Sequence, residues 1–122
     1  MNAHLKYTLA AFAIACTSSV SAAYIGPSDT PSYQTVKQIN ANPVDDAPVT
    51  LQGFIIKQLR NDKYLFSDGT GEIRVDIDHQ YFPPQPISDK TKVRLRGEIE
   101  KDYLQSPEID VEAPLEILPQ TN

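Results

Sequence analysis

From residue 49 onward, apolar and polar residues alternate along the chain, the period of two that is typical of half-buried β-strands. In the first run the apolar residues lie on one face as far as Gly53, and beyond it they appear on both faces. A glycine inside a strand often marks a bulge or a sharp bend. We therefore expect one long first strand that is bent at Gly53.

Four further alternating runs predict four further strands. These runs cover residues 63–66, 73–77, 92–100 and 109–117. Tyr64 and Phe66 share one face of the second strand, so we expect both side chains to point into the core. Pro114 falls within the last run and cannot donate a hydrogen bond to a neighbouring strand. The fifth strand therefore needs a sheet edge or a bulge at that position.

The chain before the strands has a different pattern. Thr35 and Gln38 have the spacing of a capping box, and Val36 and Ile39 lie on one helical face. These residues predict one short helix near 35–41. A second non-strand segment, 79–90, contains three prolines and is predicted to be non-helical.

Residues 1–22 have the features of a cleavable secretory signal peptide. Lys6 precedes an apolar run, and Val20-Ser21-Ala22 resembles the small-residue pattern at a cleavage site. The apolar run, Tyr7 to Ala15, is too short to span a membrane. We therefore expect a protein of the periplasm, with no membrane insertion after signal cleavage and a mature chain that begins at Ala23 or Tyr24.

The mature chain is expected to have an extended arm, 23–34, followed by a single domain, 35–122. Cleavage removes Cys16, the one cysteine, so disulfides and cysteine chemistry are excluded from the mature chain. Cleavage also removes one of 11 basic residues, which leaves 10 against 16 acidic ones, a net charge of −6. Proteins that bind nucleic acid usually neutralise phosphates with a basic surface. We therefore expect no nucleic-acid partner.

The sequence Asp68-Gly69-Thr70-Gly71 could be a phosphate-binding loop, a calcium loop or a turn. It lacks the lysine and spacing of a P-loop, and it is followed by a strand, whereas a dinucleotide-binding loop is followed by a helix. It also lacks the alternating oxygen ligands of an EF-hand loop. We interpret it as a hairpin turn in which the glycines supply positive φ angles, so Asp68→Asn should change stability little.

Acidic residues gather at the outward faces and ends of the third and fourth strands. The simplest interpretation is a solvated face that also contains Arg74, Arg94 and Arg96. The alternative is a divalent-cation site, because carboxylates and histidine are metal ligands. Its candidate ligands are Asp76, Asp78, His79, Glu98, Glu100 and Asp102. Hydrolysis by paired carboxylates or by a triad that uses His79 has little support, since no serine has the G-x-S-x-G context.

A short helix and five strands of this spacing fit the OB architecture, an all-β, five-stranded Greek-key barrel. The sequence also resembles the bacterial OB-fold (BOF) family of small, exported, stress-associated proteins. The resemblance is carried by YIGPS at 24–28, TV at 35–36, DDAPVTLQGFI at 45–55, DKYLFSDGTGEIRVDID at 62–78, VRLRGEIEKDY at 93–103 and EIDV at 108–111.

The resemblance implies a periplasmic barrel without catalytic residues or a nucleic-acid-binding surface, and with a small molecule or another ligand as its partner. The chain departs from the family pattern in two loops. Tyr81 and Phe82 lie near a position where family members tend to have tryptophan, and YLQSP at 103–107 is slightly longer than the usual turn. Both changes affect loops, where ligand choice is decided.

OB domains usually bind ligands across strands two and three and between the loops that join strands 1–2 and 4–5. Here that surface is predicted to contain Arg60, Lys63, Leu65, Arg74, Asp76 and Tyr103. With no cofactor and no catalytic residue expected, the sequence predicts a non-enzymatic module. Its function would be the binding of a small molecule, glycan or peptide, or a role in stress tolerance, with cation binding as the alternative. Its partner would be a small molecule, a cell-wall fragment or a periplasmic protein.

Overall fold

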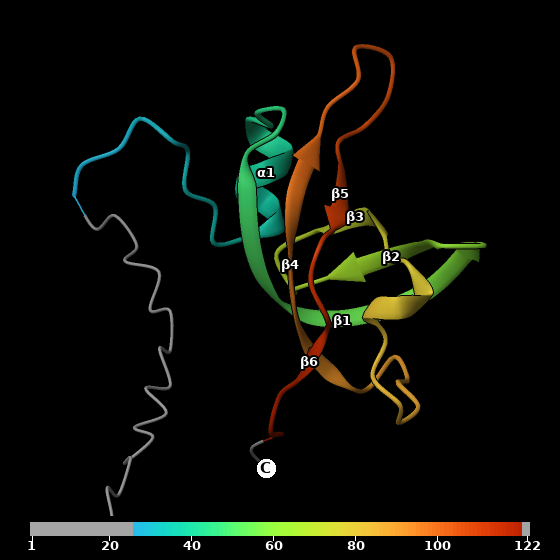
Figure 1. Cartoon of the computed structure of the whole chain (residues 1–122). Coiled ribbons are helices and arrows are strands. Elements are labelled where there is room, and N and C mark those ends of the chain that lie inside the picture. Colours follow the sequence, from blue (N-terminus) through green and yellow to red (C-terminus); the bar gives the residue numbers. More distant parts are fainter. Residues whose placement is uncertain (1–25, 121–122) are drawn as a thin grey trace, which may run out of the picture.

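The computed structural model describes residues 26–120 and shows a closed β-barrel with one short helix against it (Figure 1). The elements in chain order are α1 (Val36–Ala41), β1 (Pro48–Arg60), β2 (Lys63–Ser67), β3 (Glu72–Asp76), the 3₁₀ turn η1 (His79–Tyr81), β4 (Lys92–Glu100), β5 (Glu108–Val111) and β6 (Glu116–Ile117). Residues 26–34 contain no helix or strand. The predicted signal peptide and the first part of the arm lie outside the described residues.

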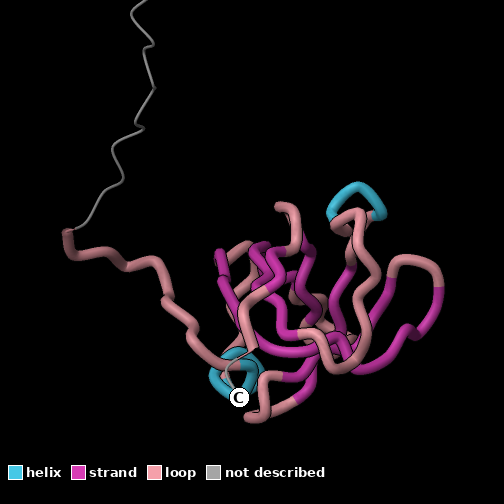
Figure 2. Tube along the Cα trace, turned by 90° about the horizontal axis from the view of Figure 1, so that it is seen from below, coloured by secondary structure: helices cyan, strands magenta, loops and turns pink. Residues whose placement is uncertain are grey.

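Strands β1 to β5 form the barrel. β1, β2 and β3 are consecutive antiparallel neighbours, and β4 pairs antiparallel with both β1 and β5. A parallel pairing of β3 with β5, in which Val75 lies opposite Ile109, completes the ring. The predicted five-stranded OB barrel with one short helix is confirmed. Figure 2 shows the strands surrounding a common centre.

Gly53 allows β1 to take part in both halves of the barrel. β1 pairs with β4 as far as Phe54 and with β2 from Phe54 onward. A Cβ atom on Gly53 would lie 2.3 Å from the carbonyl oxygen of Ser67 and 2.9 Å from the ring of Phe66. Only a residue without a side chain fits this approach. The predicted bend is present, and the pairing with β2 shifts register directly after Ile55.

The core follows the predicted alternation. Its buried members include Phe66 from β2 and at least one inward residue of every other barrel strand. The residues of lowest exposure are Val36, Ile39, Leu51, Phe66, Val75, Ile77, Val93, Leu95, Ile99 and Ile109. Tyr64 is only partly buried but packs against this cluster, as predicted.

Two predictions about the second half of the chain need correction. The predicted strand 109–117 is two strands, β5 and β6, separated at Pro114. The second of them pairs with the start of β4. The segment 79–90 is also not wholly non-helical, because His79–Tyr81 forms one 3₁₀ turn before the first proline. Asp78 caps this turn, its side chain accepting a hydrogen bond from the main-chain N–H of Gln80.

The predicted capping box of α1 is present, and it is completed by a residue from the barrel. The N–H of Gln38 donates to the Thr35 hydroxyl at 3.1 Å, and the Gln38 side chain accepts from the N–H of Thr35 at 3.2 Å. The N–H of Val36 donates to Oδ2 of Asp68 at 2.9 Å. A carboxylate in the β2–β3 turn therefore accepts from the first N–H group of the helix.

The β2–β3 turn holds the helix at a second point. The main-chain N–H and hydroxyl of Thr70 donate to Oδ1 of Asp68 at 2.9 and 2.6 Å, and the Thr70 hydroxyl oxygen accepts from the N–H of Lys37 at 3.1 Å. Gly69 has the expected positive φ, 88°, but Gly71 does not. Gly71 instead lies close to Val36, so its small size serves the packing of the helix.

Candidate ligand-binding surface

The outward face of β2 and β3 brings together four of the six predicted binding residues. In the antiparallel register, Lys63 lies opposite Asp76 and Leu65 lies opposite Arg74. Their neighbours along each strand point inward, so alternation puts all four on the same side of the sheet. Strand pattern alone was sufficient to predict this patch.

Lys63 is engaged within the protein. Its ammonium group lies 3.0 Å from Oδ2 of Asp76 and also donates a hydrogen bond to the carboxylate of Glu108 on β5. The hydrogen bond to Glu108 raises the pKa of Lys63, against the opposing effect of burial. Glu108 was absent from the predicted site, although the alternation of EIDV indicated that its side chain faces outward.

Arg74 makes fewer polar contacts within the protein than Lys63 does. Its guanidinium makes a long hydrogen bond, 3.4 Å, to the carbonyl oxygen of Ser106, and within residues 26–120 it has no ion pair. Arg74 and Leu65 line a cleft of about 450 Å³ between β2–β3 and the loop that precedes β5. The remaining lining residues are Asn40, Glu72, Ile73, Ser106 and Pro107.

Of the six predicted residues, only Leu65 and Arg74 line this cleft. Arg60 lies at the exposed end of β1, directly opposite Lys63 on β2, so it borders the patch without lining the cleft. Tyr103 lies in the loop 101–107, which extends from the end of the barrel between β4 and β5 (Figure 1). The side chains of Tyr103 and Leu104 are 101% and 93% exposed, so both are free to contact a ligand but contact little of the protein.

The predicted cation ligands fall into separate groups. Asp76 and Asp78 line an acidic cleft of about 570 Å³. The other residues that line it are Asp62, Gln80, Tyr81, Asp110, Val111 and Glu112. His79 does not line this cleft, and its ring centroid lies 6.4 Å from that of Phe82.

The three remaining candidate ligands lie on or beyond β4. Glu98 and Glu100 are opposite Asp110 and Glu108 of β5, whereas Asp102 belongs to the exposed loop. Within the described part of the chain, no three acidic, histidine or cysteine side chains are grouped so that they could hold a metal ion. The acidic residues therefore form an extended face and not a preformed metal centre.

Like charges oppose one another on this acidic face. Burial, followed by the negative charges of Asp110 and Glu108, raises the pKa of Glu100. Burial, followed by the charge of Asp76, raises the pKa of Asp110. Lys63 is the cation that partly compensates both groups. An additional cation near these carboxylates would relieve the same repulsion.

No helix in residues 26–120 is long and apolar enough to cross a membrane.

The sequence has clear relatives. Over 104 residues it is 46% identical to the calcium-regulated OB-fold protein CarO of Pseudomonas aeruginosa, an alignment that covers 85% of this chain and 88% of that protein. It is 43% identical over 67 residues to the protein YgiW of Escherichia coli K12, covering 55% of this chain and 51% of the relative. The latter match therefore spans about half of each protein.

Solved structures with a similar fold include that of the same E. coli relative. The structure of YgiW from E. coli superposes with a TM-score of 0.63 at 32% identity, covering 80% of this chain and 99% of the other. A replication protein A heterotrimer bound to single-stranded DNA superposes with a TM-score of 0.54 at 22% identity, covering 73% of this chain and 81% of that one, which shows a shared fold alone. The family described as "Bacterial OB fold (BOF) protein" matches this sequence over residues 11–115. The chain therefore belongs to the bacterial OB-fold (BOF) protein family.

Proposed function

We propose that this protein is a non-enzymatic binding module of the periplasm, and that it binds a polar, carboxylate-bearing molecule such as a cell-wall fragment. The observation that carries the proposal is Arg74, a guanidinium without an ion pair in residues 26–120, beside Leu65 in an open cleft. Arginine forms paired hydrogen bonds with a carboxylate, and the leucine offers an apolar contact to the rest of the ligand.

Single-stranded nucleic acid is a poor candidate for this surface. OB domains that bind it combine a basic groove with aromatic side chains on which bases stack. The outward residues of β2 and β3 are not aromatic, and Asp76 and Glu108 neutralise Lys63. The similarity to the replication protein A structure, at 22% identity, is one of fold and gives no information about the ligand of this protein.

A ligand screen by thermal shift tests the proposal. The mature protein is mixed with cell-wall fragments that carry free carboxylates and with the same fragments after amidation of those carboxylates. We expect a rise in melting temperature with the first set only, because binding to the native state adds about 2.7 kcal/mol of stability at 100 times the dissociation constant.

The matched variants are Arg74→Ala and Arg96→Ala. Arg96 lies on β4, is well exposed, and is 3.6 Å from Glu116. Arg74→Ala should remove the thermal shift, while Arg96→Ala should retain it. Equal shifts in both variants would place the ligand elsewhere and reject the Arg74 cleft.

A second candidate function is binding of a divalent cation in the acidic cleft. One observation favours it, namely that Asp62, Asp76, Asp78, Asp110 and Glu112 line a single cleft. Calcium is the first cation to test, since the relative from P. aeruginosa is described as calcium-regulated. A calcium-dependent rise in melting temperature that is lost in the Asp76→Asn, Asp78→Asn double variant would support this function. No calcium effect on the parent protein would exclude it.

A further inference from the structure

The second half of β1 has a free edge. β4 pairs with β1 only as far as Phe54, whereas β2 pairs with it from Phe54 to Arg60. Ile55–Arg60 therefore has a strand on one side only. Among residues 26–120, no loop forms main-chain hydrogen bonds with this stretch on the other side. Such a row of N–H and C=O groups is a template for an additional strand.

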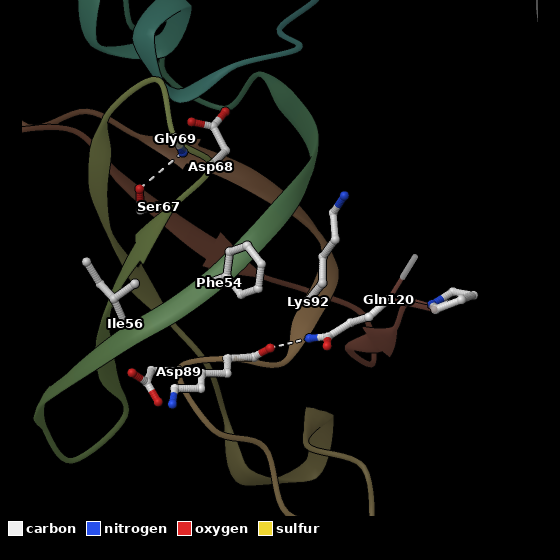
Figure 3. A pocket seen from close by; sticks show the side chains of 10 residues that line it. Phe54, Ile56, Ser67, Asp68, Gly69, Asp89, Lys92 and Gln120 are labelled. Carbon is white, nitrogen blue, oxygen red and sulfur yellow. Dashed lines mark hydrogen bonds between the residues drawn. The ribbon is translucent and has the colours of Figure 1, made fainter. Parts of the chain in front are cut away.

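The space beside this edge is open. Beyond the pairing of Phe54 with Lys92, β1 and β4 diverge, and a cleft of about 680 Å³ opens between them. Figure 3 shows Phe54 and Ile56 projecting from β1 on one side of the cleft, with Asp89, Lys92 and Gln120 around it. A smaller cleft of about 250 Å³ continues from Ile56 along β1.

Two apolar side chains are exposed on the free half of β1. Ile56 and Leu59 are 36% and 41% exposed, and both fall where the register with β2 is interrupted. Bulges of this kind redirect side chains and are frequent beside binding sites. The edge therefore offers apolar contacts as well as main-chain hydrogen-bonding groups.

The charge around the edge is opposite to that of the whole chain. Lys57 and Arg60 on β1 and Lys90 and Lys92 across the cleft give four positive charges, against three negative ones from Asp62, Asp68 and Asp89. The local sum is +1, whereas the chain as a whole has a net charge of −5. None of these four cations forms an ion pair within residues 26–120.

We propose that Ile55–Arg60 binds an extended acidic segment of another polypeptide as an added β-strand. Main-chain hydrogen bonds would supply much of the affinity, and side chains at alternate positions would enter the cleft beside Phe54 and Ile56. The surrounding lysines and arginine select acidic sequences. A second copy of this chain fits less well, because antiparallel pairing of two such edges would bring their basic side chains together. This surface is distinct from the Arg74 cleft.

The test uses three short synthetic peptides with blocked ends. The first alternates valine and glutamate, the second alternates valine and lysine, and the third is the acidic peptide with a central proline. Binding is followed by fluorescence anisotropy, and the site by hydrogen exchange of the main-chain amides. We expect only the first peptide to bind and to slow exchange within Ile55–Arg60. Equal binding of the proline peptide, or protection elsewhere, would overturn the proposal.

Charge variants provide the second arm of the test. Lys57→Glu with Arg60→Glu should weaken binding of the acidic peptide about tenfold or more at low salt. The control, Lys37→Glu with Lys101→Glu, makes the same charge change on α1 and in the 101–107 loop and should leave binding nearly unchanged. Equal weakening in both variants would show a general charge effect and reject the edge.

Two further measurements separate this site from other interpretations. Arg74→Ala should leave binding of the acidic peptide unchanged, so the edge and the Arg74 cleft can fail independently. Hydrogen exchange of the protein alone should not slow within Ile55–Arg60 as protein concentration rises. Slowing without peptide would assign the edge to a second copy of the chain and overturn the proposal.

Discussion

The carboxylate of Asp68 accepts a hydrogen bond from the main-chain N–H of Val36 at 2.9 Å, across 32 positions of sequence. This contact joins the β2–β3 turn to the first residue of α1. Asp68 also accepts two hydrogen bonds from Thr70. The turn therefore fixes the helix over the barrel as well as joining two strands.

Replacing Asp68 should consequently destabilise the protein. We expect Asp68→Ala to lower the free energy of unfolding by about 1–2 kcal/mol, the usual effect of losing a helix cap. Asp68→Asn should lower the free energy of unfolding by less than Asp68→Ala does. The loss should still exceed that expected for a simple turn residue, because an amide has one acceptor oxygen where the carboxylate has two. Chemical denaturation measures both. Asp89→Ala, a change at an exposed aspartate, is the control, and equal effects at the two positions would contradict the capping role.

Gly53 gives the sharpest test of the barrel geometry. Gly53→Ala would bring a Cβ within 2.3 Å of the Ser67 carbonyl oxygen, so β1 and β2 must move apart. We expect a loss of about 1–3 kcal/mol, as for other overpacked sites. Gln52→Ala, at the exposed neighbouring position, should change the denaturation midpoint far less. An unchanged midpoint for Gly53→Ala would mean that β1 does not approach β2 so closely.

Two aspartates should affect the pH dependence of stability with opposite signs. Burial alone would raise the pKa of Asp68, but hydrogen bonds from Thr70 and Val36 outweigh it and lower the pKa. The stabilisation that Asp68 contributes is therefore present above the pKa that its carboxyl group has in the unfolded chain. It is lost as pH falls through the lower pKa of the native state. The pKa of Asp110 is raised in the native state, so its ionisation destabilises the fold as pH rises through the acidic range.

Asp110→Asn should therefore raise the melting temperature at pH 7, where the native carboxylate is charged and faces Asp76. The gain should disappear in acid, once the parent carboxyl group is protonated. Melting curves of parent and variant between neutral and acidic pH measure this difference. A gain that persists unchanged at low pH would point to packing and not to charge.

The mature N-terminus can be measured directly. Lys6, the apolar run after it and Val20-Ser21-Ala22 predict cleavage that leaves Ala23 or Tyr24 as the first residue. Mass spectrometry of the protein from a periplasmic extract should show one of these two masses. Recovery of the full-length chain from the cytoplasm would reject export. A lipid on Cys16 would mean that the mature chain begins at this cysteine and is anchored to a membrane, which would reject cleavage at Ala23 or Tyr24.

Local pattern was sufficient to predict most of the barrel. Alternation placed Phe66 and Leu95 in the core, and Thr35 with Gln38 predicted the start of the helix. The local pattern also predicted the β2–β3 patch, because a hairpin places the residues of its two strands opposite one another. Each of these features depends on residues close in sequence.

The features that sequence did not predict depend on distant contacts. The hydrogen bond from Val36 to Asp68 links two elements whose packing no local period reveals. The bond from Lys63 to Glu108 likewise requires β5 to lie beside β3. The free edge of β1 exists because the pairing of β4 with β1 stops at Phe54, where β4 begins at Lys92. This end point depends on how the two strands meet in the folded barrel.

The parallel pairing of β3 with β5 also has a consequence for folding kinetics. β1, β2 and β3 can form a meander through short turns, but Val75 meets Ile109 only after the intervening chain has looped back. Closing such a loop loses chain entropy before any contact compensates it, and pairings distant in sequence slow folding. We expect ring closure to be late, so Ile109→Val should mainly accelerate unfolding, whereas a destabilising change in the meander should also slow refolding.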